Sequence, residues 1–277
     1  MSDTAAQYQA LLSRIAADGT SEGDNYVAFS GGVDSALVAH GVHRVFPGRA
    51  LAVMALSPSV SREMRASAEA VAAHIAIPLR FVQTYETENP VYVANEGLSC
   101  YVCKSGIYDA MKAIRELLPA GEVRLFNGTN ADDLSDPTRV GLLAAREHGV
   151  LSPLDYLRKE DVRRLSRHAG LPNWNHAASP CLRSRLHSGV PASDVHLHRV
   201  ESAERIVRST YGLSPACNFR VRHLPGDLAM LEFDAETLAT VDPALCRDAL
   251  IGLGYADVQI RVFRSGAVAF TPSASDS

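Results

Sequence analysis

The residues with the clearest chemical potential form a short segment near the N-terminus. Residues 30–35 read Ser-Gly-Gly-Val-Asp-Ser, directly after an apolar run and directly before a helical pattern. Two glycines let a backbone close around an anion, and hydroxyl and helix N-terminal amide groups donate hydrogen bonds to phosphate oxygens. The segment matches neither the Walker loop nor Gly-x-Gly-x-x-Gly. It predicts a phosphate-binding loop of a different kind.

Three cysteines form the second group. Cys100 and Cys103 are separated by two residues, and Cys181 lies in the sequence Pro-Cys-Leu-Arg-Ser-Arg. Three soft thiolates suffice for an iron–sulfur cluster with one position left open. The Cys100/Cys103 spacing also suits a redox dithiol or a partial zinc site. The odd total of five cysteines argues against a disulfide framework.

A polar loop at residues 128–133, Gly-Thr-Asn-Ala-Asp-Asp, contributes two carboxylates. Mg²⁺ prefers oxygen ligands and shares them with substrate phosphates. We therefore expect Asp132, in preference to Asp133, to face a metal–nucleotide complex. An ordinary turn, which also favours Gly, Asn and Asp, is the alternative interpretation.

Positive charge is concentrated in one segment of an acidic chain. The 277 residues carry a net charge of -4 with a pI near 6.2, which disfavours a protein that binds long nucleic acid. Between residues 183 and 223, seven arginines stand against three acidic residues. This balance suits a small anionic ligand, with a solvated helix face as the alternative.

The elements that must position these residues alternate between buried strands and helices. Apolar runs predict strands at residues 26–29, 51–56, 79–84, 123–126 and 150–154. Helical patterns cover residues 36–45, 61–75, 102–118 and 159–170. This alternation predicts an α/β fold with a doubly wound, parallel, five-stranded sheet. With strand order 3-2-1-4-5, the loops and the cysteines would meet in one crevice at its carboxyl edge.

An irregular stretch at residues 172–191 marks a boundary, and we predict two domains, 1–175 and 176–277. The second is expected to be a smaller α+β domain. Its helices are expected at residues 192–211 and 235–252, and its strands at 219–223, 229–233 and 258–263. The tail at 271–277 is expected to be frayed.

Targeting signals are not apparent in the sequence. The N-terminus lacks a basic start followed by an apolar run, so no secretory signal is expected. The apolar run at residues 51–56 is far shorter than the ~20 residues that a membrane-spanning helix needs. We expect a cytoplasmic protein.

The segment at residues 30–35 resembles the PP-loop of the ATP pyrophosphatase superfamily, whose members cleave ATP to AMP and pyrophosphate while adenylating a substrate. The resemblance implies that the pyrophosphate half of ATP is held by Ser30, Gly31, Gly32, Asp34 and Ser35. A plain tight turn is the alternative.

The same resemblance implies further contacts with the nucleotide. Ala55 and Leu56, at the end of the second strand, would line the adenine pocket. Gly128, Thr129 and Asp132 would face the nucleotide and its Mg²⁺.

Further motifs narrow the resemblance to the LarE family, over most of the chain. They are Cys-Tyr-x-Cys-Lys, Gly-Thr-Asn-x-Asp-Asp, Ser-Pro-Leu, Ala-Ser-Pro-Cys-Leu-x-Ser-Arg and Phe-Arg-Val-Arg-His, in that order. Members of this family are sulfur transferases that build the nickel-pincer nucleotide cofactor of lactate racemase. Their substrate is pyridinium-3,5-biscarboxylic acid mononucleotide, whose carboxylates become thiocarboxylates.

The resemblance implies adenylation of a carboxylate followed by displacement of AMP by a sulfur nucleophile. In one branch of the family, a lone cysteine at the position of Cys181 donates its own sulfur and becomes dehydroalanine. In the other branch, three cysteines hold a [4Fe-4S] cluster that relays sulfide. The presence of Cys100 and Cys103 together with Cys181 favours the cluster branch.

The resemblance also implies roles for residues near Cys181. Ser184, Arg185 and Glu201 would join it in catalysis, with Glu201 placed where a helix begins. A surface ion pair between Glu201 and Arg205 is the alternative.

Arg220 and Arg222 are spaced at the strand period, so both lie on one face and could bind the same anion. By the resemblance they would bind substrate. Exposed charges on a surface strand are the alternative.

A PP-loop tRNA thiolase and a non-catalytic ATP-binding sensor are competing interpretations. The acidic pI disfavours the thiolase, which needs a broad basic surface. The sensor leaves the intact loop and Asp132 unexplained. The expected partners are a small anionic pyridinium mononucleotide, other copies of the chain in a homo-oligomer, and transiently other cofactor-biosynthesis proteins; neither a polynucleotide nor a membrane is expected.

Overall fold

The computed structural model describes residues 3–116, 121–136, 138–177, 180–214 and 217–263. It divides into two compact units. The first comprises Met1–Glu86 and Cys100–Ser179, and the second comprises Thr87–Ser99 and Pro180–Ser277. The chain therefore enters the second unit briefly before it returns at Cys100. Leu118, the expected helix end, and the tail at 271–277 lie outside the described residues.

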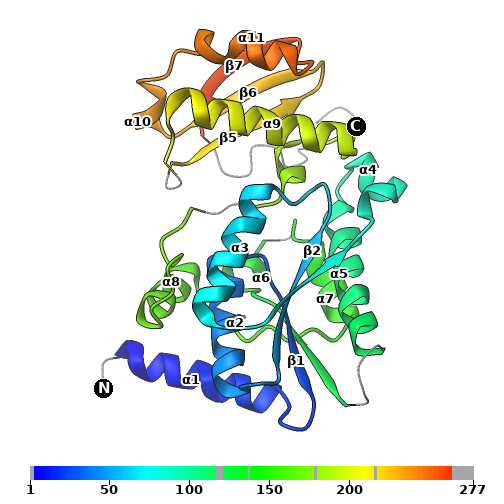
Figure 1. Ribbon diagram of the computed structural model, residues 1–277, viewed down its shortest axis with the longest axis vertical. Coiled ribbons are helices and arrows are strands. Elements are labelled where there is room, and N and C mark those ends of the chain that lie inside the picture. The colour runs from blue at the N-terminus through cyan, green and yellow to red at the C-terminus, as the bar shows by residue number, and fades with distance from the viewer. Residues whose placement is uncertain (1–2, 117–120, 137, 178–179, 215–216, 264–277) are drawn as a thin grey trace, which may run out of the picture. The chain divides into compact units, whose positions relative to one another are not determined.

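The first unit is built on a parallel sheet, which confirms the α/β fold class (Figure 1). Its strands are β1 (Asp24–Ala28), β2 (Ala50–Leu56), β3 (Leu79–Gln83) and β4 (Val123–Phe126), in the order β3-β2-β1-β4. Tyr26 of β1 is in register with Leu51 of β2 and with Leu125 of β4. This order puts the carboxyl ends of all four strands at one edge.

The fifth strand expected at residues 150–154 is reduced to two isolated parallel bridges. Phe126 pairs with Leu151 and Asn130 pairs with Leu154. Pro153 interrupts the run, and because proline has no N–H it cannot donate to a continuous ladder. The segment therefore runs parallel to β4, as the sequence predicts, but it does not form a continuous strand.

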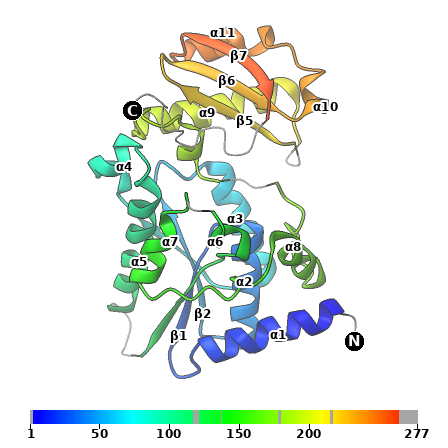
Figure 2. The ribbon, with the colours of Figure 1, turned by 180° about the vertical axis from the view of Figure 1, so that it is seen from behind.

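Helices cover both faces of this sheet (Figure 2). One face packs against α1 (Asp3–Asp18), α2 (Val33–Val45), α3 (Arg62–Ile75) and α8 (Lys159–His168). The other packs against α5 (Ser99–Glu116) and α7 (Gly141–Glu147). Shorter helices are η1 (Glu86–Glu88) and α6 (Ala131–Leu134).

Local sequence explains where these helices begin and end. Ser61 caps α3 by accepting a hydrogen bond from the Met64 amide, and the helix ends at Ala76, which has φ +62. Leu37 and Met111 are fully buried on opposite faces of the sheet. The hydrophobic cores on the two faces therefore hold the loops at the carboxyl edge in place.

The second unit has a mixed sheet in the order β5-β6-β7. Its strands are β5 (Phe219–Leu224), β6 (Leu228–Phe233) and β7 (Asp257–Val262), with β5 and β6 antiparallel and β6 and β7 parallel. Its helices are α4 (Pro90–Ala94), η2 (Leu182–Arg185), α9 (Asp194–Tyr211), α10 (Ala235–Leu238) and α11 (Ala244–Gly252). Pro243 separates α10 from α11, so the expected helix at 235–252 is divided.

The segment 87–99 is held within the second unit by one buried side chain. Asn95 adopts a left-handed backbone conformation with φ +56. Its Nδ2 donates to the carbonyls of His187 and Val190 at 2.9 and 3.0 Å, and its Oδ1 accepts from Arg183 at 2.7 Å. These side-chain bonds, together with the Ala192 amide that donates to the Val93 carbonyl, join parts of the unit that are about ninety residues apart in sequence.

Within the described residues, every helix is too short or too polar to cross a bilayer.

Candidate functional site

The phosphate loop, residues 30–35, joins β1 to α2 and closes on itself through its two serines. Ser35 Oγ lies 3.1 Å from Ser30 Oγ, accepts from the Ser30 amide at 3.2 Å, and donates to the Gly32 carbonyl at 3.1 Å. Ser30 and Gly32 are exposed, whereas Gly31 is buried. The N-cap residue of α2 is Gly32, which has no side chain with which to cap the helix. An anion bound here would therefore meet the positive end of a helix.

Two glycines allow the backbone to pack closely around this loop. Gly31 has φ +71, and a Cβ on it would lie 2.6 Å from the Cα of Ala68 in α3. A Cβ on Gly128 would lie 2.7 Å from the Ser35 amide nitrogen. Because these neighbours are backbone atoms, neither position has room for a side chain. The two segments expected to bind nucleotide thus lie side by side.

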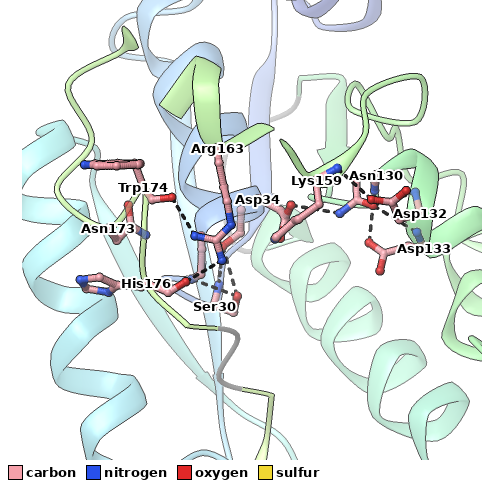
Figure 3. Close-up of polar contacts among 12 residues, drawn as sticks. Ser30, Asp34, Asn130, Asp132, Asp133, Lys159, Arg163, Asn173, Trp174 and His176 are labelled. Carbon is pink, nitrogen blue, oxygen red and sulfur yellow. Dashed lines mark hydrogen bonds and ion pairs between the residues drawn. The ribbon is translucent and has the colours of Figure 1, made fainter. Parts of the chain in front are cut away.

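Asp34 is the centre of a polar network at this edge of the sheet (Figure 3). Asn130 Nδ2 donates to Asp34 Oδ1 at 3.0 Å, and Lys159 Nζ forms an ion pair with Asp34 Oδ2. Asn130 Oδ1 also accepts from the Asp133 amide at 3.1 Å and so caps α6. One amide side chain therefore fixes the 128–133 loop to the phosphate loop.

Lys159 is a site residue that the sequence reasoning missed. The pattern places it only at the start of a helix, and it is 125 residues from Asp34 in the chain. A lysine ammonium is a compact charge that suits phosphate oxygens. With the glycine cradle and the exposed hydroxyl of Ser30, it completes a donor set that fits the polyphosphate of a nucleotide.

Asp132 and Asp133 have different surroundings. Asp133 accepts from the Asn130 amide at 3.2 Å through Oδ2 and pairs with Arg139 at 2.8 Å through Oδ1. Asp132 is exposed and accepts from the Lys159 amide at 2.8 Å. Asp133 is thus engaged at both oxygens in local structure. Asp132 is the more accessible carboxylate, and its contact with Mg²⁺ stays a prediction.

The remaining residues expected at the nucleotide lie where their strands end. Ala55 and Leu56 are half-buried at the end of β2, and the Leu56 carbonyl accepts from the Thr84 amide at 3.1 Å. The Thr129 amide donates to Asn127 Oδ1 at 3.0 Å, directly after β4. All three therefore belong to the same edge as the phosphate loop.

Cys100 and Cys103 lie in the first two turns of α5, and both are half-buried. Residues three apart share a helix face, so the two thiols can serve one metal centre. Cys103 Sγ lies 3.9 Å from Oε1 of Glu86, a buried carboxylate that also accepts from Ser59 Oγ at 3.0 Å and from Ser57 Oγ.

Glu86 is a buried carboxylate beside the Cys103 thiol. Its Oε2 is buried and has no hydrogen-bond partner within the described part of the chain. A metal or a cluster binds thiolates rather than thiols, so the proton that Cys103 shares with Glu86 would be released when such a group binds. The sequence reasoning missed Glu86 because it begins η1, a single short turn after β3 that no sequence pattern marks.

Cys181 belongs to the second unit, where a tight turn fixes its backbone. Its carbonyl accepts from the Ser184 hydroxyl at 2.7 Å, from the Ser184 amide at 3.0 Å and from Arg185 Nη1 at 3.2 Å. The Cys181 side chain is half-exposed. The structure therefore brings together Cys181, Ser184 and Arg185 as expected. The expected crevice shared with Cys100 and Cys103 joins both units and stays a prediction.

An arginine network surrounds this turn. Arg185 Nε donates to Glu204 at 2.9 Å, and Arg222 Nε donates to Glu232 at 2.7 Å. Arg222 Nη1 also donates to the Ser184 carbonyl at 2.7 Å, which links β5 to the Cys181 turn. The whole network comprises Arg185, Arg220, Arg222, Arg261, Glu204 and Glu232.

The network carries more positive than negative charge. Its four guanidiniums stand against two carboxylates, and Glu232 is fully buried between Arg222 and Arg261. Burial, together with the nearby Arg185 guanidinium, lowers the pKa of Arg220 to about 10. Added negative charge would relieve this repulsion. Arg220 and Arg222 are only 9% and 5% exposed, so the alternative of surface strand charges is wrong.

Glu201 does not stand at the start of a helix, because α9 begins at Asp194. Its expected catalytic role stays a prediction. The carboxylate that contacts Arg185 is Glu204, one turn of α9 further on. The pattern of charges in the sequence could not separate these two acids, because they are three residues apart in the same helix.

No protein-family model matches the sequence. The chain is 42% identical over 184 residues to an uncharacterised protein of Synechocystis sp., and this alignment covers 66% of the chain and 68% of that protein. It is 31% identical over 188 residues to the pyridinium-3,5-bisthiocarboxylic acid mononucleotide synthase of Lactiplantibacillus plantarum, covering 66% of each protein.

Proposed function

Because the chain belongs to the LarE-like family, we propose that it is an ATP-dependent sulfurtransferase that makes a thiocarboxylate of a pyridinium mononucleotide. The substrate would be pyridinium-3,5-biscarboxylic acid mononucleotide, and the product would serve biosynthesis of the nickel-pincer nucleotide cofactor. In this proposal the enzyme is cytoplasmic and acts as a homo-oligomer.

The first unit would carry out adenylation. A substrate carboxylate oxygen attacks the α-phosphate of ATP, and pyrophosphate leaves while an acyl-adenylate forms. The phosphate loop and Lys159 would bind the leaving pyrophosphate, whose charge grows as the bond breaks. Mg²⁺, if held by Asp132, would neutralise phosphate charge and orient the triphosphate of ATP.

The second unit would bind the anionic substrate and present the sulfur. Its phosphate and carboxylate groups match the excess positive charge of the arginine network. In the sacrificial alternative, the Cys181 thiolate attacks the acyl-adenylate carbon and expels AMP. Loss of the Cα proton then breaks the Cβ–Sγ bond, which leaves a thiocarboxylate and dehydroalanine.

We favour the cluster alternative because Cys100 and Cys103 share a helix face beside Glu86. A [4Fe-4S] cluster on Cys100, Cys103 and Cys181 would supply a sulfide as the nucleophile and leave the polypeptide intact.

The observation that carries the proposal is the direct bonding of the Cys181 turn to the arginine network. Arg185 and Arg222 both donate to carbonyls of residues 181–184. Binding of an anion to this network would therefore place it close to the backbone that holds Cys181. Neither a tRNA thiolase nor a sensor needs this arrangement.

The proposal is tested by incubating the full chain with Mg-ATP, sulfide and the pyridinium mononucleotide. We expect pyrophosphate and AMP to form only when the mononucleotide is present, and a product heavier by 16 Da per exchanged oxygen to appear by mass spectrometry (replacement of O by S). Pyrophosphate release that depends on tRNA instead would support the thiolase. ATP binding without pyrophosphate release would support the sensor.

The source of the sulfur is tested by Cys100→Ala, with Cys217→Ala as the control. Cys217 contacts Asp234 and Thr237 in the second unit and has no assigned role. We expect Cys100→Ala to lose iron and most multiple-turnover product formation, because a cluster needs all three thiolates. Full activity of Cys100→Ala, with conversion of Cys181 to dehydroalanine, would replace the cluster with sacrificial donation.

A further inference from the structure

A cluster of two imidazoles and a carboxylate lies in the second unit. Its residues are separate in sequence from the turn that holds Cys181. We call it the imidazole–carboxylate cluster. It consists of His196 in α9, His223 in β5 and Asp227 in the turn between β5 and β6. One possible ligand atom from each residue lies within 4.8 Å of the other two. Neither the phosphate loop nor the arginine network contains any of these residues.

The cluster opens onto a cavity rather than packing into the core. A cavity of about 200 Å³ is lined by the three cluster residues together with Val190, Pro191 and Pro225. His223 is 1% exposed, whereas the side chain of Asp227 is 50% exposed. An ion could therefore reach the cluster from solvent while one ligand remains buried.

His196 is oriented by a neighbouring hydroxyl. Its Nδ1 lies 2.9 Å from Ser193 Oγ, the N-cap residue of α9. Its ring meets that of His223 edge to face, with 4.9 Å between centroids. In metal sites, a hydrogen bond to one ring nitrogen typically fixes the tautomer and points the other at the ion. Ser193 can serve this purpose for His196.

The two ring nitrogens of His223 have different surroundings. Its Nε2 lies 3.2 Å from Asp227 Oδ1, while its Nδ1 is buried without a hydrogen-bond partner within the described residues. Buried polar atoms are nearly always satisfied, so the surroundings of this ring do not account for both of its nitrogens. Nε2 lies beside Asp227, so it is the ring nitrogen that could share a cation with that carboxylate, and Nδ1 would then keep the ring's single proton.

Asp227 is held in an unusual backbone conformation. It has φ +54, in the left-handed region that L residues other than Asn and Asp rarely adopt. Arg199 Nη1 donates to its Oδ1 at 2.5 Å, which leaves Oδ2 without a hydrogen bond in the described part of the chain. Ligating carboxylates in metal sites are themselves hydrogen-bonded by neighbouring groups. Arg199 would fill that role.

We propose that the imidazole–carboxylate cluster binds one divalent transition-metal ion of the zinc class. Two imidazole nitrogens favour Zn²⁺, Co²⁺ or Ni²⁺ over Mg²⁺ and Ca²⁺, which prefer oxygen ligands. Three protein ligands leave a coordination position that faces the cavity, as in open zinc sites. The ion would join α9 to the β5–β6 turn.

The rival explanation is that Arg199, Asp227 and His223 form only a structural polar network. The Arg199 guanidinium opposes a cation by its charge, and it is held over the Tyr255 ring at 5.6 Å. In the rival case the ion pair alone stabilises the turn. The two explanations differ in whether the isolated chain takes up a metal stoichiometrically.

The proposal is tested by titrating Co²⁺ and Zn²⁺ into the full chain with Cys100, Cys103 and Cys181 all replaced by Ser. This background removes the thiolates proposed to hold a cluster. We expect one Co²⁺ per chain, with visible bands that lack thiolate charge transfer and that Zn²⁺ displaces. Because the readout is metal uptake, it does not depend on the proposed sulfurtransferase activity.

Two variants in this background identify the ligands. Asp227→Asn keeps a residue that tolerates positive φ but removes the carboxylate, and His196→Ala alters a half-buried position. We expect each to weaken Co²⁺ binding at least ~100-fold, since even the loss of an outer-shell partner costs about 10–100-fold. His198→Ala is the matched control, because His198 is exposed on the same helix.

Each outcome decides for or against the site. Circular dichroism first establishes that the variants fold. Stoichiometric binding that is lost in Asp227→Asn and His196→Ala but kept in His198→Ala supports the proposal. The absence of stoichiometric binding to the parent background, or affinity unchanged in both cluster variants, would overturn it in favour of the structural network.

Discussion

Replacement of Cys181 by Ser is expected to abolish thiocarboxylate formation while pyrophosphate release stays within about threefold of the parent. The hydroxyl nearly matches the thiol in size, so the turn and its bonds from Ser184 and Arg185 should persist. A serine, however, neither donates sulfur nor replaces a thiolate ligand of a cluster. Both alternatives for the sulfur source predict the same loss.

This prediction is measured in single-turnover reactions that follow pyrophosphate and the thiocarboxylate separately. Cys217→Ser is the control, since the same chemical change is made in the same unit away from the Cys181 turn. Thiocarboxylate formed at the parental rate by Cys181→Ser would exclude Cys181 from sulfur transfer. Loss of both products together would mean that Cys181 also supports adenylation.

Lys159→Met is expected to reduce substrate-dependent pyrophosphate release about 10²–10³-fold, the usual cost of removing one preorganised charge that stabilises the transition state. Methionine keeps the length of the apolar stem but removes the ammonium that pairs with Asp34. The leaving pyrophosphate would then lose one positive contact, and Asp34 would lose its counter-ion.

The effect is measured as kcat for pyrophosphate release at saturating Mg-ATP. Lys112→Met provides the control, because Lys112 is exposed on α5 and distant in sequence from the phosphate loop. A change in thermal stability without a change in kcat would give Lys159 a structural role only. Equal loss in both variants would point to a general effect of net charge.

The sequence predicted the first four strands because each is a compact run of apolar residues bounded by polar turns. The same reasoning overestimated residues 150–154, where Pro153 prevents a continuous ladder although the hydrophobic pattern continues. Hydrophobic periodicity records which residues are buried, but it does not record whether each amide has a partner. Whether residues 150–154 form a strand or only two bridges depends on the hydrogen-bond partners of their amides, which the hydrophobic pattern does not show.

For the candidate site, local motifs were informative and distant pairings were not. The phosphate loop and the Cys181 turn are each contained in about six residues. Lys159 acts through a partner 125 residues away, and the partners of Glu86 and Glu232 lie on other elements, so their own local sequences do not mark them. From the sequence, Glu232 in an alternating strand is expected to be exposed, because a buried glutamate is rare unless it is paired. Only the structure shows that Arg222 and Arg261 pair with it.

The early excursion of the chain into the second unit sets an order for its folding on the ribosome. Residues 87–99 leave the exit tunnel well before His187 and Val190, whose carbonyls accept the Asn95 amide. Until those carbonyls are made, the Asn95 amide remains hydrated and the left-handed turn at that residue has no partner to hold it. The first unit can meanwhile fold, because its second segment begins at Cys100 and is synthesised before His187. The thirteen residues Thr87–Ser99 remain outside its fold until the second unit is synthesised. The second unit is therefore begun before the first is complete and finished after it, so the two units do not fold strictly one after the other during synthesis.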